Sequence, residues 1–105
     1  MQVLVQFHRQ VEEDLDRWLS AGELDDENRE ALVDVYIEEL IRVLQETVGE
    51  PDHAVRQNSS EPRLYRWRYT DEVEIDYVVK TRGPGLFRFR SVRIIVFEIR
   101  FEVSQ

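Results

Sequence analysis

Apolar and polar residues alternate at the start of the chain and then change to a helical period. Val3, Val5 and Phe7 alternate with Leu4 and Gln6, which predicts a strand over residues 3–7. One helix face follows, formed by Val11, Leu15, Trp18 and Leu19. A longer apolar stripe comes next, formed by Val33, Ile37, Leu40, Ile41, Leu44 and Val48. The spacing predicts helices over residues 11–21 and 26–48, the second stopped by Gly49 and Pro51.

The second half of the chain returns to a period of two after a polar loop that is predicted over residues 52–62. Apolar positions alternate with charged ones at Tyr65, Trp67, Tyr69, Val73, Ile75, Tyr77 and Val79. Gly83-Pro84-Gly85 indicates a turn, and Phe87 and Phe89 then alternate with arginines. The run 92–97 is nearly all apolar, which is typical of a central strand covered on both faces. The alternation that includes Phe89 does not continue into this run, because Ser91 and Arg93 stand where apolar residues are expected. This shift of phase predicts a bulge or short break near Ser91.

These patterns predict a single α+β domain over residues 1–105. An N-terminal strand precedes a two-helix hairpin, which packs on one face of an antiparallel sheet of three to four C-terminal strands. The N-terminal strand is expected to join that sheet. Trp67 is expected to be buried against Leu40, Leu44 or another residue of the long helix's stripe, while the residues that alternate with the aromatic row face away from the helices.

The charge is distributed unevenly between the two halves. The chain has a net charge of −8, with 14 basic and 22 acidic residues. Residues 1–52 contain 4 arginines and 15 acidic residues, whereas residues 53–105 contain 10 basic and 7 acidic residues. The acidic total argues against indiscriminate binding to nucleic acids or membranes. Without cysteine or an apolar run of about 20 residues, and with a strand in place of a signal peptide, a cytoplasmic protein is expected.

Arginines on the predicted strands form the main candidate for a binding surface. The candidate binding residues are Arg66, Arg68, Arg82, Arg88, Arg90 and Arg93. Alternation places Arg66 with Arg68, and Arg88 with Arg90, on shared faces. Glu74 and Asp76 are expected on the same face, so three interpretations stay open: an ion-paired surface, a site for a partner's carboxylates, or a contact with a nucleic-acid backbone.

Two segments carry a family resemblance that spans nearly the whole chain. LYRWRYTDEVEIDYVVKTR, followed by RSVRIIVFEIRF, in the order β-α-α-β-β-β, is similar to the RelE/ParE toxin superfamily of bacterial toxin–antitoxin systems. The resemblance implies ribosome-dependent mRNA cleavage or inhibition of DNA gyrase, and neutralisation by an antitoxin peptide. It also implies a functional role for Arg100, at the end of the last strand, as the candidate catalytic residue.

The chain departs from the family pattern in its acidic charge and in its C-terminal tail. The tail 101–105 lacks the Tyr or His with which many family nucleases assist the chemistry. We therefore expect no strong RNA cleavage; if the chain is an enzyme, it is an mRNA endonuclease. The alternative is a non-enzymatic interaction module that uses the Arg-lined sheet face or the acidic helical hairpin.

The sequence predicts no cofactor and no metal site, because His8 and His53 are isolated and no phosphate-binding loop is present. The expected partner is an antitoxin-like or other protein, with the ribosome and mRNA as the partners of an active toxin and no membrane contact. A homodimer is among the oligomeric states that the sequence leaves open.

Overall fold

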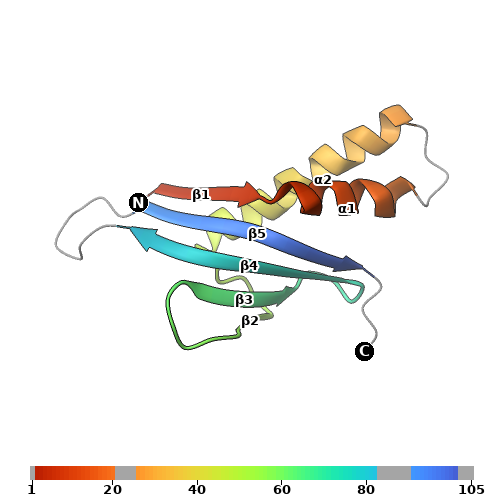
Figure 1. Cartoon of the computed structure of the whole chain (residues 1–105). Helices are drawn as coiled ribbons and strands as arrows, with labels where there is room; N and C mark the ends of the chain where they lie inside the picture. Colours follow the sequence, from red (N-terminus) through yellow and green to blue (C-terminus); the bar gives the residue numbers. More distant parts are fainter. Residues whose placement is uncertain (1, 21–25, 83–90, 102–105) are drawn as a thin grey trace.

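Seven elements follow one another in the computed structural model, which describes residues 2–20, 26–82 and 91–101 (Figure 1). Strand β1 is followed by two helices and then by four strands. Their bounds are β1 Gln2–Phe7, α1 Arg9–Ser20, α2 Asp26–Glu46, β2 Ala54–Arg56, β3 Arg63–Arg68, β4 Val73–Arg82 and β5 Ser91–Phe101. None of the helices in these ranges is long and apolar enough to cross a membrane. The predicted α+β class and the order of its elements are confirmed.

The strands form one five-stranded sheet in the order β1-β5-β4-β3-β2. β1 pairs with β5 in parallel, with Val3 opposite Val92 and Phe7 opposite Val96, and the other neighbours are antiparallel. The predicted addition of the N-terminal strand to the sheet is confirmed. The C-terminal strands β2 to β5 are antiparallel, as predicted, and the parallel β1 makes the whole sheet mixed. The sequence had left the direction of β1 open, since alternation along a strand carries no information about the direction of its neighbour.

The loop predicted over residues 52–62 contains the short strand β2. Ala54 lies opposite Trp67 and Arg56 opposite Tyr65, at the outer edge of the sheet. A strand of three residues gives too little alternation for a pattern to reveal it. The predicted helix bounds also shift slightly: α1 begins at Arg9, and α2 ends at Glu46.

Strand β5 is central, as predicted, but the expectation that it is covered on both faces is wrong. Val92, Ile94 and Val96 are buried, whereas Ile95 is half-buried and Phe97 is 37% exposed. A register shift also lies within β5: Asp76 pairs with Glu98 and Tyr77 with Val96, so that Phe97 is the extra residue. The predicted irregularity near Ser91 borders residues 83–90, and these residues, including the predicted turn and Phe87–Phe89, lie outside the described part.

One face of the sheet packs on the helices and forms the core. Buried side chains from β3, β4 and β5 share a cluster with Val11, Leu40 and Leu44 of the helices. Trp67 is 4% exposed within this cluster, which confirms its predicted burial on the helix side. At the far end, the indole of Trp18 stacks on Phe101 with ring centroids 4.5 Å apart, which fixes α1 on β5.

The turn after α2 joins the long helix to the sheet through Gly49. Gly49 N–H donates to the Leu44 carbonyl at 2.9 Å, and its own carbonyl accepts the buried Tyr77 hydroxyl at 2.6 Å. Gly49 has a φ of 78°, a conformation that L side chains adopt at a cost. A Cβ here would lie 3.0 Å from Val79 Cγ2 and 3.3 Å from Ile94 Cδ1.

Gly49→Ala is therefore expected to lower the free energy of unfolding by about 2 kcal/mol, from the left-handed backbone together with the crowding against β4 and β5. Urea denaturation of the purified protein measures this loss. An unchanged midpoint would show that the turn accommodates a side chain and does not lie tightly on the sheet.

Candidate binding face of the sheet

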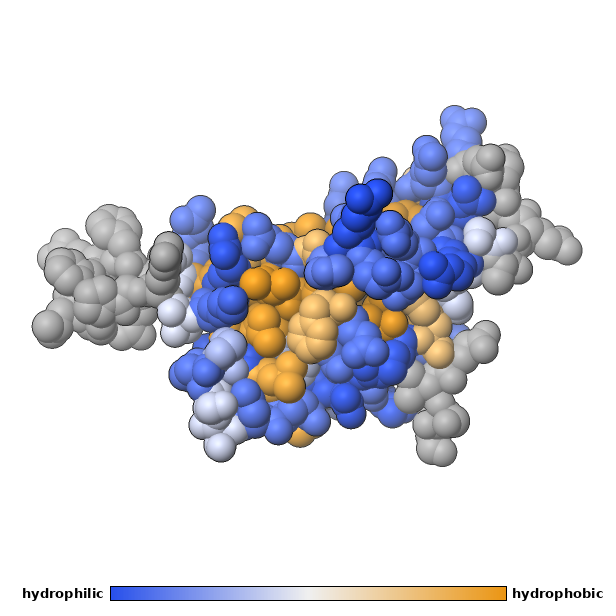
Figure 2. Space-filling view, in the orientation of Figure 1, coloured by the Kyte–Doolittle hydropathy of each residue, from blue (hydrophilic) through white to orange (hydrophobic). Residues whose placement is uncertain are grey.

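The sheet face that points away from the helices, called the open face below, is organised in cross-strand rows. One row is apolar and consists of Leu64, Val78 and Ile95 on β3, β4 and β5. On one side of it lies a row of Lys80, Arg93 and Leu4. On its other side lie two charged rows, Arg66 with Asp76 and Glu98, then Arg68 with Glu74 and Arg100. Figure 2 shows apolar surface along the middle of the molecule between hydrophilic regions.

The two charged rows form one ion-paired cluster, called the carboxylate–guanidinium cluster. Arg100 Nη2 lies 2.6 Å from Glu74 Oε1 and 2.8 Å from Asp76 Oδ1, and its Nη1 lies 3.1 Å from Glu98 Oε2. Arg66 Nε lies 3.2 Å from Asp76 Oδ1. Arg68 Nη2 lies 3.5 Å from Glu74 Oε2. The cluster thus contains three guanidinium groups and three carboxylates, and its formal charge is balanced.

Asp76 is the buried centre of this cluster, with 5% of its surface exposed. Burial by itself would raise the pKa of the Asp76 carboxyl, but hydrogen bonds from Arg100 and Arg66 outweigh burial and the pKa is lowered from 3.8. The hydrogen bond with Asp76 raises the pKa of Arg100 against the effect of its burial. Both groups therefore stay ionised at neutral pH.

Some of the predicted arginines are ion-paired in this cluster, and the others are not. Arg66, Arg68 and Arg100 contact Glu74 and Asp76, as in the ion-paired interpretation of the sequence. All three guanidinium nitrogens of Arg100 donate to carboxylates, so its donors already have partners. The other predicted arginines are not part of this cluster. Arg93 lies at the opposite end of the open face, Arg82 ends β4 opposite Ser91, and Arg88 and Arg90 lie outside the described residues.

Sequence reasoning missed Lys80 and Leu4, which line a pocket of about 510 Å³ together with Arg93. Lys80 is in phase with Glu74 and Asp76 along β4, and this phase was the signal that could have placed it on the open face. No comparable signal was available for Leu4, because alternation on an edge strand does not reveal which strand lies beside it.

The two histidines differ in their position relative to the cluster: His8 begins α1, and His53 lies beside the cluster. His8 Nδ1 accepts the Gln10 backbone N–H at 3.1 Å at the start of α1, as a capping side chain does. His53 has a φ of 69° in the turn before β2, its carbonyl accepts the Arg68 N–H at 3.3 Å, and it lines a second pocket with Arg66, Arg68 and Glu74. Within residues 2–20, 26–82 and 91–101, no three His, Cys, Asp or Glu side chains gather in a way that could hold a metal ion.

Comparison with known proteins identifies the class of fold. No family model matches the chain, and no curated protein matches its sequence. A solved structure of a YoeB/ParE toxin from Agrobacterium tumefaciens superimposes with a TM-score of 0.50 and 18% sequence identity. The match covers 98% of this chain and 100% of that chain. At this identity the likeness concerns the fold. The chain has a RelE/ParE-like toxin fold, and the resemblance seen in the sequence is confirmed at that level.

Proposed function

We propose that this chain is a toxin-fold protein that acts by binding a protein partner and does not cleave mRNA. The observation that carries the proposal is the carboxylate–guanidinium cluster, in which Arg66, Arg68 and Arg100 contact Glu74, Asp76 and Glu98. The open face therefore presents a balanced cluster where the resemblance implies a catalytic arginine.

RNA cleavage requires cations that are free to stabilise a developing phosphate charge, and an acid or base close to the scissile bond. Arg100 has its donors occupied, and the three carboxylates around it repel a phosphate. The net charge of −8 adds long-range repulsion. Each of these features disfavours RNA on the open face.

Protein binding is favoured by apolar surface beside cations, and the apolar row of the open face is half-buried, so that part of its surface stays exposed. The apolar row of Leu64, Val78 and Ile95 adjoins Arg93 and Lys80, and this combination suits an antitoxin-like peptide. Gyrase inhibition, the other activity that the resemblance implies, also proceeds through a protein target and fits the proposal.

A second candidate surface is the helical hairpin. Leu32 is 42% and Val35 is 61% exposed on the N-terminal half of α2. In Figure 1 this half projects past the end of the sheet. Apolar side chains exposed on an otherwise acidic helix favour contact with a partner helix.

Expression of the chain in a bacterium, with growth and mRNA integrity followed together, tests the proposed function. We expect intact mRNA, because the donors of Arg100 are occupied by carboxylates. Slow growth together with intact mRNA would point to a protein target. Growth arrest with ribosome-dependent cuts that Arg100→Ala abolishes would contradict the proposal. Arg9→Ala, on the outer surface of α1, is the matched control for loss of one arginine.

A further inference from the structure

Two cations lie directly opposite one another at one end of the open face. Lys80 on β4 pairs in register with Arg93 on β5. Like charges in this position destabilise a sheet. No carboxylate of the described residues forms an ion pair with either side chain. The connecting segment, residues 83–90, contains no Asp or Glu that could balance them.

The opposite end of the same face is built differently. There every guanidinium of the carboxylate–guanidinium cluster has a carboxylate within 3.5 Å. The chain has an excess of acidic residues, yet none of those in the described ranges is paired with Lys80 or Arg93. A pair of like charges without carboxylate partners is available to an anionic group from outside the chain.

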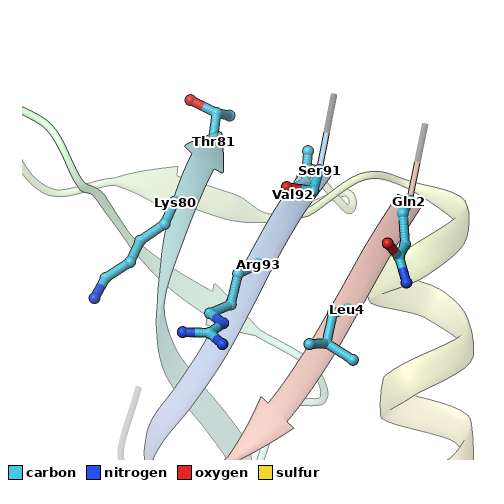
Figure 3. Close-up of a pocket in the computed structure, with 7 residues that line it drawn as sticks. All are labelled: Gln2, Leu4, Lys80, Thr81, Ser91, Val92 and Arg93. Carbon is cyan, nitrogen blue, oxygen red and sulfur yellow. The ribbon is translucent and has the colours of Figure 1, made fainter. Parts of the chain in front are cut away.

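The surroundings of the pair define the kind of ligand. Lys80, Arg93 and Leu4 lie side by side on β4, β5 and β1 and line the pocket of about 510 Å³ together with Thr81 and Ser91 (Figure 3). Val78 and Ile95 of the apolar row lie two residues along the same strands, about 7 Å away. Alternate side chains of an extended peptide have the same spacing.

We propose that this end of the open face binds an extended segment of a protein partner in which a carboxylate side chain is followed, two positions on, by an aliphatic one. The carboxylate contacts Lys80 and Arg93, and the aliphatic side chain lies on Val78 and Ile95. This inference rests on the proposed function and adds to it the chemistry of the partner and the residues that recognise it.

An acidic peptide fits this surface better than RNA does. Nucleic-acid binding gains its affinity from many phosphate contacts, and Lys80 and Arg93, the cations that the described residues place in this row, supply few of them. A strand of phosphates that continued along the face would also meet Asp76 and Glu74 of the cluster. An extended peptide with an acidic and an aliphatic side chain instead places its carboxylate on Lys80 and Arg93 and its aliphatic side chain on the apolar row.

Fluorescence anisotropy with a labelled ten-residue peptide of alternating Glu and Leu residues tests the proposal. We expect saturable binding that weakens as salt is added. Binding should weaken at least tenfold in Lys80→Gln/Arg93→Gln, and equally when the Glu residues of the peptide are replaced by Gln. Arg9→Gln/Arg17→Gln removes the same charge from α1 and is expected to bind as the parent chain does. Thermal unfolding of each variant checks that it is folded.

Several outcomes would overturn the inference. The first is absence of peptide binding, and the second is an equal loss of peptide affinity in Lys80→Gln/Arg93→Gln and in Arg9→Gln/Arg17→Gln. The third is tighter binding of a ten-nucleotide RNA than of the peptide through Lys80 and Arg93. Concentration-dependent dimers that Lys80→Gln/Arg93→Gln dissociates would identify a second copy of the chain as the occupant and also overturn it. Failure of this inference is separable from failure of the proposed function, because mRNA cleavage is measured without the peptide.

Discussion

Truncation of Trp67 to alanine is expected to lower the free energy of unfolding by about 3–5 kcal/mol, the largest effect of any single substitution considered. The indole is 4% exposed and lies against two tyrosines, with ring centroids 5.1 Å from Tyr69 and 6.5 Å from Tyr77. Its Nε1–H also donates to the Asp52 carbonyl at 3.1 Å, so that the substitution leaves both a cavity and an unpaired acceptor.

Urea denaturation followed by far-ultraviolet circular dichroism measures this loss without depending on tryptophan fluorescence. Val55→Ala is the matched control from the neighbouring strand, because Val55 is 61% exposed and its truncation should cost less than about 0.5 kcal/mol. A loss at Trp67 no larger than the loss at Val55 would mean that the aromatic row faces solvent, which would leave it open to stacking with bases.

Replacement of Asp76 by alanine is expected to cost about 2–4 kcal/mol. Asp76 accepts hydrogen bonds from both Arg66 and Arg100, and its loss leaves two guanidinium groups facing one another across β4. This loss is smaller than for a fully buried ion pair, because the side chains of Arg66 and Arg100 are 48% and 30% exposed and water can solvate them when Asp76 is removed. Glu98→Ala is the matched control, since Glu98 is 50% exposed and its ion pair should contribute less than about 1 kcal/mol.

The same carboxylate predicts how stability depends on pH. Because the pKa of Asp76 is lower in the folded chain than its ordinary value of 3.8, the unfolded chain binds the proton more readily. The stabilisation by Asp76 is complete above the ordinary pKa, and it is lost as pH falls through the folded pKa. Denaturation midpoints between pH 6 and pH 2.5 should fall less steeply for Asp76→Ala than for the parent chain. Identical slopes would show that the cluster does not hold Asp76 ionised.

Sequence reasoning reached the fold because the periodicity is strong where the core forms. Trp67 and Tyr77 alternate with charged residues over six or more positions, and Leu40 and Leu44 keep a helical stripe. The pattern failed where alternation is short or interrupted. β2 has only three residues, and the extra residue Phe97 disturbs the phase of β5.

The chemistry of the open face was only partly accessible from the sequence. The phase of Arg66, Glu74 and Asp76 along β3 and β4 predicted that they share a face, and it left open whether the arginines are paired or free. Their pairing depends on the antiparallel register that brings Arg100 opposite Glu74, and on the bulge at Phe97 that sets this register. The register between two strands that are distant in the sequence cannot be predicted from the alternation within each strand.

Cleavage of ribosome-bound mRNA by the purified protein tests the central claim most directly, because it needs neither the protein partner nor a living cell. The protein is added to ribosomes that carry a defined mRNA, and new RNA ends are mapped by primer extension. The balanced cluster around Arg100 predicts the same RNA ends with and without the protein. New ends that depend on the ribosome and disappear with Arg100→Ala would show that this arginine acts on RNA and would contradict the account.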